Sequence, residues 1–479
     1  MRYKLIVHSI GNLMLLLALA MSVPMSIAAL DREPDLTAFL YAIGIALTLG
    51  MACRQVRPTG AFGRREGFVV VTLGWVVLSA LGALPFLFSG TVPTFTDAFF
   101  ETMSGFTTTG STILPKIEGI PRGILFWRGL THWLGGMGII VLSVAIFSAF
   151  QTGTALYQAE VPGHNKERFL PRLRQAAITL WLIYAVLTLA QTLLLLAAGM
   201  PLFESVVHTF ATMATGGFST RTISVEAFGS VAYEIVIVIF MTLAGMNFTL
   251  FYKTVQKRSL KAMFSSLEAR IYLAILAAAA LAITATLILG SRLPLGTAFR
   301  QAVFQVVSMM TTTGFTSTNY DVWPALAKGI LFFLMFVGGC TGSTAGAIKV
   351  ARLVLLCKYA RRQLLRVARP RRVVQTTLDE TPVTDTVVHE ILAFFFLYFL
   401  LFVGGALVVM ATGEEMITSL SASATTLGNV GPGFGAIGPL GSFAGFNPVA
   451  KWVLSFLMLA GRLEIFTVLV LFTPGFWRK

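Results

Sequence analysis

Charged residues are scarce in this sequence. Only 12% of its 479 residues are Asp, Glu, Lys or Arg, whereas soluble chains carry about 25%. Hydrophobic residues make up 56% of the chain. Apolar runs of about 20 residues, the length needed to cross the hydrocarbon of a bilayer, recur along the whole sequence. The composition therefore excludes a soluble globular protein and indicates a polytopic membrane protein.

Cysteine and catalytic motifs are also scarce. The three cysteines, Cys53, Cys340 and Cys357, lack the spacing of metal ligands and give no disulfide framework. The five histidines show no metal-ligand spacing either. The sequence holds no nucleophile–base pair, Walker loop or dinucleotide fingerprint. We therefore predict that the chain is not an enzyme, carries no organic cofactor and does not itself bind a nucleotide.

Acidic residues are outnumbered by basic ones, 21 against 36, which gives a formal net charge of +15. Lys and Arg gather on the cytoplasmic loops of membrane proteins, so this excess indicates topology rather than binding of nucleic acid. We expect ten membrane spans. They lie near Leu5–Leu30, Leu36–Cys53, Gly67–Ser89, Gly123–Phe150, Ala176–Gly199, Val231–Tyr252, Ala269–Gly290, Ala325–Leu356, Val387–Thr412 and Pro448–Phe472.

The basic residues orient these spans. With a cytoplasmic N-terminus, the acidic loop Asp31–Asp35 lies outside and every basic cluster lies inside, as the positive-inside rule requires. These clusters are Arg54–Arg65, Lys166–Arg174, Lys253–Lys261, Lys358–Arg372 and the C-terminal Arg478 and Lys479. Both termini are then cytoplasmic. A cleaved signal peptide is the alternative for the first run, which is long for that purpose and is followed at once by a second span.

Four glycines, Gly110, Gly217, Gly314 and Gly431, each close a short Thr/Ser-rich apolar segment between two of these spans. The segments are too short to cross the membrane and lie near Phe95–Ser111, Leu202–Phe218, Gly296–Phe315 and Met416–Pro432. Six residues before each glycine stands a small residue, namely Ser104, Ala211, Ser308 and Thr425. Small residues allow close helix packing. The pattern predicts four repeats of span, descending half-helix, glycine-bearing strand and span.

This pattern suits potassium. Four such strands around one axis form a ring of backbone carbonyls, which can replace the water around the ion. Glycine allows the positive φ that turns a carbonyl toward the axis, and a half-helix entering from outside points its negative end at the centre. A calcium or magnesium site would instead need carboxylates, and the segments offer none at the glycine. The alternative is that the glycines serve only helix packing.

The segments TTTGSTIL, ATGGFSTRT, TTTGFTSTNYDVWP and LGNVGPGFG resemble the four filter loops of the Trk/Ktr/HKT superfamily of potassium transporters. The likeness is closest to the Trk-type potassium-uptake membrane subunit, and it includes two N-terminal spans that Ktr-type subunits lack. It implies an all-α membrane protein of about ten transmembrane helices, with four pseudo-fourfold helix–re-entrant loop–helix repeats around one pore. The potassium filter is expected at Thr108, Thr109, Gly110, Thr215, Gly216, Gly217, Thr312, Thr313, Gly314, Asn429, Val430 and Gly431.

The resemblance also implies a location and partners. It places the protein in the bacterial inner membrane as a homodimer, above a ring of cytosolic nucleotide-binding regulatory subunits of the TrkA type. The expected organisation has two N-terminal helices followed by four pore repeats. The predicted boundaries are 1–60 for the N-terminal helices and 61–160, 161–262, 263–375 and 376–479 for the repeats.

The second span of the third repeat contains VGGCTGSTAGAIK, Val337–Lys349, whose glycines should break a helix at mid-membrane. The break is either a flexible kink or an intramembrane loop that blocks the pore below the filter, and the resemblance implies the loop. The predicted gate consists of Gly338, Gly339, Cys340, Thr341, Gly342, Ser343, Thr344, Ala345 and Gly346, together with Arg462.

Arg462 lies in the last span, where a charged side chain needs compensation. No acidic residue stands three or four positions away on its helix, so we expect carbonyls of the broken helix at Cys340–Ala345 to accept its hydrogen bonds. It would then hold the gate closed and repel cations. The alternative is a purely structural ion pair or a side chain that snorkels to the membrane surface.

Two further features leave alternatives open. The basic run Lys358–Arg372 acts as a topology signal, contacts anionic membrane lipid or docks the cytosolic partner. Glu101, His208 and Gln305 stand nine residues before their glycines, and we expect them to bond buried backbone behind the filter. A proton relay is the other possibility for these three.

Two hypotheses for function follow from these features. The first is a selective, gated pore for potassium uptake, regulated by a cytosolic nucleotide-binding subunit. The second is a secondary symporter that couples potassium to protons or sodium by alternating access. Four similar loops in repeats of the same sense favour the pore, because such symporters use inverted repeats.

Overall fold

The computed structural model describes the chain except for residues 59–62, 150–168, 370–374, 380 and 479. The predicted repeat boundaries at 60–61 and 160–161, and the basic residues Lys166 and Arg168, lie outside the described residues. Within the described part the protein is helical, with one short hairpin of β1 (Thr377–Leu378) and β2 (Thr381–Pro382). The predicted all-α class is confirmed.

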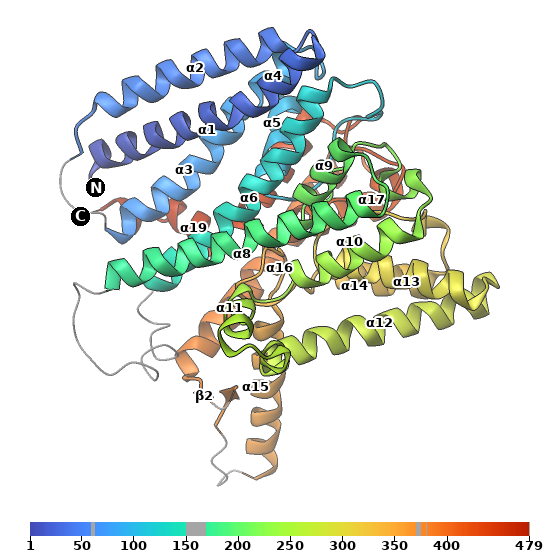
Figure 1. Ribbon diagram of the computed structural model, residues 1–479. Helices are drawn as coiled ribbons and strands as arrows, with labels where there is room; N and C mark the ends of the chain where they lie inside the picture. Colours follow the sequence, from blue (N-terminus) through green and yellow to red (C-terminus); the bar gives the residue numbers. More distant parts are fainter. Residues whose placement is uncertain (59–62, 150–168, 370–374, 380, 479) are drawn as a thin grey trace.

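Long apolar helices form the body of the molecule (Figure 1). They are α1 (Tyr3–Asp31), α2 (Leu36–Gln55), α3 (Arg64–Gly82) with α4 (Leu84–Phe88), α6 (Arg122–Ala149), α8 (Phe169–Ala197), α12 (Leu267–Ser291) and α16 (Asp385–Ala411). In the described part of the chain, six helices are long and apolar enough to cross a membrane alone, and up to eight spans result if each bent pair counts as one. The chain is therefore a multi-pass membrane protein.

Two expected spans are not continuous helices. α10 (Val231–Ala244) and α11 (Phe248–Lys257) meet at 93°, and α18 (Pro448–Arg462) meets α19 (Phe466–Leu469) and η6 (Val470–Phe472) at 114°. The segments expected as spans at Val231–Tyr252 and Pro448–Phe472 are therefore each interrupted by a sharp bend. At the first bend Asn247 starts a new helix, since its side chain accepts from the Thr249 amide at 2.8 Å. At the second, Glu464 and Ile465 both have positive φ.

The span expected at Ala325–Leu356 is broken in the middle, as its glycines predicted. α14 (Ala325–Leu334) ends, a non-helical segment follows, and α15 (Val350–Ala368) begins. α15 and the β1–β2 hairpin project from the helical body (Figure 1). The near part of α15 is anchored to α16 by a small cluster of Leu355, Val383, Val388 and Ile391.

Four short helices occupy the predicted re-entrant segments. They are α5 (Phe95–Phe106), α9 (Leu202–Met213), α13 (Leu295–Met310) and α17 (Met416–Gly428). α5 has a side-chain cap at its start, where Thr94 accepts from the Asp97 amide at 3.2 Å. The small residues Ser104, Ala211, Ser308 and Thr425 are all wholly buried, so the half-helices pack closely against the spans around them.

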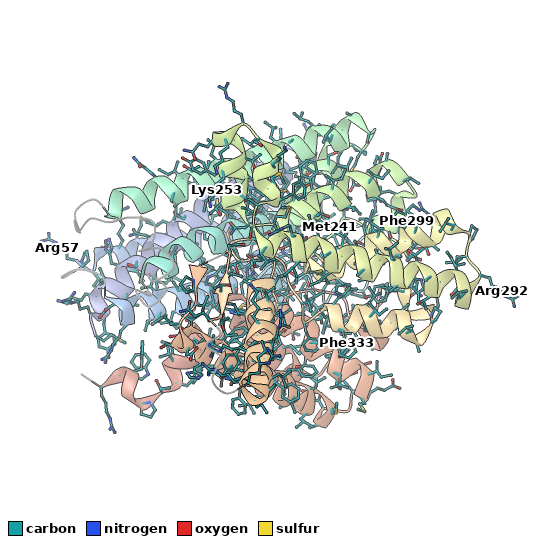
Figure 2. The ribbon with its side chains drawn as sticks, turned by 90° about the horizontal axis from the view of Figure 1, so that it is seen from below. Arg57, Met241, Lys253, Arg292, Phe299 and Phe333 are labelled. Carbon is teal, nitrogen blue, oxygen red and sulfur yellow. The ribbon has the colours of Figure 1, made fainter. Side chains whose placement is uncertain are left out.

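The remaining elements are short: η2 (Ser224–Phe228), η3 (Leu260–Phe264), η4 (Tyr320–Val322), η5 (Gly435–Ile437) and α20 (Pro474–Trp477). The two chain ends lie beside each other (Figure 1), where Ile6, Val69 and Phe476 pack together. Arg57, which precedes α3, and Arg292, which follows α12, lie at opposite ends of the molecule (Figure 2). The two connections therefore lie on opposite faces, as alternating spans require.

Candidate functional site

Each half-helix runs directly into a strand with the same backbone conformation. Two residues before the filter glycine, φ is left-handed, between 52° and 56°, at Thr108, Thr215, Thr312 and Asn429. The glycines themselves have φ of 82°, 78°, 78° and 107°. Left-handed values are costly for residues with a Cβ. Their recurrence at matching positions in four different sequences shows that the fold imposes this conformation.

The amides of these strands are bonded to their own half-helices. The residue before each glycine donates its N–H to the small residue five positions earlier: Thr109 to Ser104 O (2.8 Å), Gly216 to Ala211 O (2.8 Å), Thr313 to Ser308 O (2.9 Å) and Val430 to Thr425 O (2.9 Å). The amide before each filter glycine is thus paired within its own repeat.

The four strands close into a ring. A Cβ built on Gly110 would overlap the carbonyl oxygen of Gly216 in the next repeat. The corresponding oxygens are Thr313 O for Gly217, Val430 O for Gly314 and, returning to the first repeat, Thr109 O for Gly431 at 2.8 Å. Each filter glycine thus faces the carbonyl that precedes the glycine of the following repeat. Only glycine permits both this close approach and the positive φ.

The polar residues behind the strands make the expected contacts in part. Glu101 accepts from the Ile113 amide at 2.9 Å, which confirms its predicted bond to buried backbone. His208 also bonds backbone, the Glu204 carbonyl oxygen at 2.8 Å, in addition to Ser219 Oγ at 2.9 Å. The prediction is wrong for Gln305, whose amide donates to Ser317 Oγ at 3.4 Å, because the loop turns this serine side chain toward it.

The non-helical segment between α14 and α15, called the gate loop below, comprises residues 335–349. Its backbone bonds reach elements of several repeats. Cys340 donates to Gly245 O at 2.8 Å, Ala347 donates to Gly428 O at 2.9 Å and Gly346 donates to Thr312 Oγ1 at 2.7 Å. The loop therefore lies against the bend of the second repeat, the half-helix end of the fourth and the filter strand of the third.

Arg462 is buried beside this loop, with 3% of its surface exposed. Its Nη1 donates to Thr344 O at 2.6 Å, and its Nη2 donates to Gly135 O in α6 at 3.3 Å. The expected acceptor in Cys340–Ala345 is confirmed. Thr344 in turn donates its hydroxyl to Met213 O at the end of α9 at 3.1 Å. Arg462 thus joins α18, the gate loop and the first repeat at one point.

Three polar residues near this site escaped the sequence analysis. Glu268, at the start of α12, accepts from the Thr341 amide at 2.6 Å and from the Ala351 amide at 3.1 Å. It thereby joins the gate loop to the start of α15. Arg128 and His132 of α6 lie behind the filter. The sequence does mark Arg128, because it is a charged residue within the expected span Gly123–Phe150 and such charges usually indicate function.

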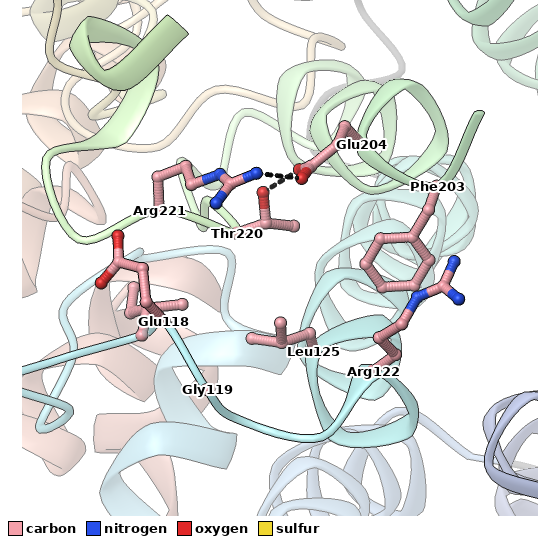
Figure 3. A pocket seen from close by; sticks show the side chains of 9 residues that line it. Glu118, Gly119, Arg122, Leu125, Phe203, Glu204, Thr220 and Arg221 are labelled. Atoms are coloured by element: carbon pink, nitrogen blue, oxygen red, sulfur yellow. Dashed lines mark hydrogen bonds and ion pairs between the residues drawn. The ribbon is translucent and has the colours of Figure 1, made fainter. Parts of the chain in front are cut away.

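A separate cavity of about 190 Å³ lies at the starts of α6 and α9, away from the ring (Figure 3). Arg221 pairs with Glu204 at 2.9 Å across it, and Arg122 stacks on Phe203 at 4.5 Å from the ring centre. Burial raises the pKa of Glu118, but hydrogen bonds from the Thr222 side chain and amide dominate and lower this pKa to about 2. Arg221 and Glu204 pair with each other, Arg122 pairs with Asp31, and Glu118 accepts from Thr222, so each of these charged lining residues already has a partner.

Four half-helix repeats that close into one ring inside a multi-pass helical body are the arrangement of a membrane transport protein. The TrkH family model, described as a cation transport protein, matches residues 37–479. The chain belongs to this family of cation transporters, and it is a transporter rather than an enzyme.

Relatives match over full length. The Trk system potassium uptake protein TrkH of Salmonella typhimurium strain LT2 is 41% identical over 490 aligned positions, and that of Escherichia coli K12 is 40% identical over 487, each covering 100% of both chains. The Trk system potassium uptake protein TrkG of Escherichia coli K12 is 34% identical over 481 positions and 99% of both chains. The crystal structure of the potassium transporter TrkH from Vibrio parahaemolyticus matches with a TM-score of 0.92 at 37% identity, over 100% of both chains.

Proposed function

We propose that the chain takes up potassium through a selective pore whose filter is the ring around Gly110, Gly217, Gly314 and Gly431. The observation that carries this proposal is the closed cycle of glycine–carbonyl contacts, which places one carbonyl of each repeat beside the glycine of the next. Carbonyl oxygens without a formal charge suit a monovalent cation that has lost its water. Potassium is the cargo named for the full-length relatives.

The half-helices add to this preference. α5, α9, α13 and α17 all end at the residue that precedes the left-handed turn or one residue earlier, so their C-terminal carbonyls approach the ring. Each C-terminus carries a partial negative charge and favours a nearby cation by about 0.3–1 kcal/mol at a surface. In the ring, Thr108 Oγ1 is buried and has no hydrogen-bond partner among the described residues. It supplies a further neutral oxygen for the ion.

The gate loop with Arg462 closes this pore. Thr344 lies at the centre of the loop. Its carbonyl oxygen accepts from Arg462, its hydroxyl donates to Met213 O and its amide donates to Ala244 O. The positive guanidinium beside the pore repels a passing cation, and its hydrogen bond holds the loop in place. Opening requires the loop to give up bonds to repeats two, three and four. Release of the loop from outside the membrane would therefore control the pore.

Control from a cytosolic regulatory subunit is the second part of the proposal. The far part of α15 has one exposed face: Leu364 and Val367 are 72% and 83% exposed, on a helix that also carries Arg361 and Arg366. Apolar residues flanked by arginine on a projecting helix suit an acidic and apolar protein surface. The location in a bacterial inner membrane, cytoplasmic termini and a homodimer complete the proposal.

Ion flux tests the function directly. Purified protein in liposomes should accumulate rubidium, a tracer for potassium, down an imposed gradient and should exclude sodium. The flux should persist when gradients of protons and sodium are abolished. Flux that requires a proton or sodium gradient would instead identify a symporter and would contradict a pore.

A further inference from the structure

A buried ion pair and a histidine connect the first and second filter strands, and among the described residues no buried ion pair connects the other strands. Arg128 and Glu101 have 2% and 0% of their side chains exposed, with Nε and Oε1 at 2.6 Å. Among the ion pairs in the described part of the chain, this one has both side chains almost wholly buried. Every other pair has one side chain that is at least 16% exposed. Burying two charges is unfavourable, so the pair needs a role that offsets its cost.

Glu101 fixes the first filter strand. Its carboxylate accepts from the Thr112 hydroxyl at 3.0 Å and from the Ile113 amide at 2.9 Å. Both residues follow Gly110 directly along the strand. The carboxylate is therefore occupied by three donors, two from the strand and one from Arg128, and its charge is fully compensated.

Arg128 and His132 fix the second strand. Arg128 Nη1 donates to Ser219 O at 2.9 Å, and its guanidinium lies over the Phe218 ring at 3.6 Å from the centre. His132, one helical turn later, accepts from the Phe218 amide through Nε2 at 3.3 Å and stacks on the same ring. Since Nε2 accepts, Nδ1 carries the proton and donates to Gly105 O at 2.8 Å.

Through these contacts, α6 of the first repeat holds Phe218 and Ser219, the two residues that follow Gly217. In the described part of the chain, the bonds between the other filter strands and the loops that follow them are neutral: Tyr320 donates to Gly433 O at 2.9 Å between repeats three and four, the Thr316 amide donates to Ser224 Oγ at 3.2 Å between two and three, and Ser111 donates to Gly431 O at 3.1 Å between one and four. The ion pairs Lys451–Asp97 and Arg300–Glu234 also link repeats, but they do not touch the strands. A planar guanidinium that bonds a carboxylate and a carbonyl at once sets a distance between them more strictly than a single hydroxyl can.

We propose that Glu101, Arg128 and His132 are positioning residues that set the separation of the first and second filter strands and thereby the selectivity of the ring. They touch no ion themselves. They act through the Gly110 and Gly217 strands, whose carbonyls must keep their spacing to favour potassium over sodium. This inference rests on the proposed potassium pore and deepens it.

The test uses variants that avoid an uncompensated buried charge. Glu101→Gln combined with Arg128→Met removes both charges while keeping similar volumes. His132→Asn keeps a donor near Gly105 but withdraws the acceptor from Phe218. The matched control is Glu234→Gln with Arg300→Met, since that pair joins α13 to α10 without touching a filter strand. Rubidium and sodium fluxes into liposomes are measured per folded molecule, for the full chain.

We expect the sodium-to-rubidium flux ratio to rise about fivefold in the Glu101/Arg128 variant and less in His132→Asn, because a shift of a few tenths of an ångström weakens size and field discrimination. The control should keep the parental ratio. If the Glu101/Arg128 and His132 variants fold and keep the parental flux ratio, the proposal is overturned, whatever their stability. If the double variant does not fold, Arg128→Lys is measured instead. It keeps the positive charge but not the planar guanidinium, so an unchanged sodium-to-rubidium flux ratio again contradicts the positioning role. Failure of the parent protein to move rubidium would instead refute the pore itself.

Discussion

The filter strands and the gate loop are both non-helical backbone inside the helical body, but they are held in different ways. In each filter strand the amide before the glycine donates within its own repeat, as Thr313 does to Ser308 O at 2.9 Å. In the gate loop, amides donate to other elements, as Cys340 does to Gly245 O and Ala347 to Gly428 O. Buried backbone must be paired in both cases.

This difference separates a fixed structure from a releasable one. Bonds within one repeat move together with that repeat, so the backbone conformation of each single filter strand survives shifts between repeats, while the spacing of the first two strands depends on Glu101, Arg128 and His132. Bonds from one loop to several repeats are broken together when the loop moves, and each is replaceable by water from an opened pore. The filter strands therefore suit constant selectivity, and the gate loop suits a transition between two states.

The strongest way to break this comparison is to disturb the ring. Gly314→Ser adds a Cβ that overlaps Val430 O and crowds Pro432, at a φ of 78°. The left-handed conformation alone costs a residue with a Cβ about 1–2 kcal/mol, comparable to a tenfold change in an equilibrium. We expect rubidium flux per folded molecule to fall about tenfold or more, with sodium discrimination reduced.

Gly296→Ser is the matched control for this change. Gly296 lies in the same half-helix, and a Cβ there meets nothing within 4 Å. Its flux and its ion preference should equal those of the parent. Parental selectivity and rate in well-expressed Gly314→Ser would contradict a filter role for that strand.

The next largest effect should come from Arg462. Arg462→Ala removes the bond to Thr344 O and the positive charge beside the pore. A hydrogen bond to a charged group is worth about 1.5–3 kcal/mol, so flux per folded molecule should rise about tenfold. Arg462→Lys keeps the charge without the planar fork and should give an intermediate flux.

A structural arginine makes the opposite prediction for both variants. Expression or thermal stability would then fall in Arg462→Ala, while flux per folded molecule would stay at or below the parental value. Normalising the rubidium flux to the monodisperse fraction from size-exclusion chromatography separates the two results.

A smaller effect is expected at Glu268, which joins the gate loop to α15. Glu268→Gln keeps one oxygen acceptor but exchanges charge-assisted bonds to the Thr341 and Ala351 amides for neutral ones, which are about half as strong. The loop should be held less tightly, and basal flux should rise about threefold, less than in Arg462→Ala.

Asp379→Asn serves as the control for Glu268. Asp379 accepts from the Leu267 amide at 2.7 Å, so it caps the same helix without touching the gate loop. A rise in flux of equal size in both variants would show that the start of α12, rather than the carboxylate of Glu268, governs the loop.

Much of this arrangement was predictable because the sequence repeats it. A Thr or Asn, a glycine and a small residue recur at fixed offsets in the four segments. The four half-helices therefore followed from the pattern around Gly110 and its three counterparts. The bond from Arg462 to Thr344 was also predictable, because a buried charge needs acceptors and the broken helix has free carbonyls.

Other features depend on tertiary contacts that hydropathy does not reveal. Apolar residues resume after both bends, at Gly245–Asn247 and Leu463–Ile465, so mean hydropathy does not reveal that the chain turns by 93° and 114° there. At the second bend Glu464 pairs with Arg352 of α15, a residue far away in the sequence. The partnership of Glu101 with Arg128 likewise depends on the relative depth of α5 and α6, which periodicity leaves undetermined.

The smallest effect is expected at a contact between repeats that touches neither the filter nor the gate. Glu118, of the first repeat, accepts from the Thr222 amide of the second at 2.9 Å, and this bonding lowers the pKa of Glu118 to about 2 from 4.5. A carboxyl with a depressed pKa stabilises the folded state above its unfolded pKa and loses this contribution as pH falls through its folded value. The contribution should be present above about pH 4.5 and lost toward pH 2.

Glu118→Gln should therefore lower the melting temperature of the detergent-purified protein at pH 6 by no more than about 2 °C, since the group is exposed and screened. The difference between variant and parent should shrink as the pH is lowered from 4.5 toward 2, as measured by thermal unfolding across that range. Rubidium flux and ion preference at pH 7 should equal those of the parent. A change in selectivity would show that bonds between repeats control the ring even at a distance, and the distinction between locally held filter strands and a shared gate loop would fail.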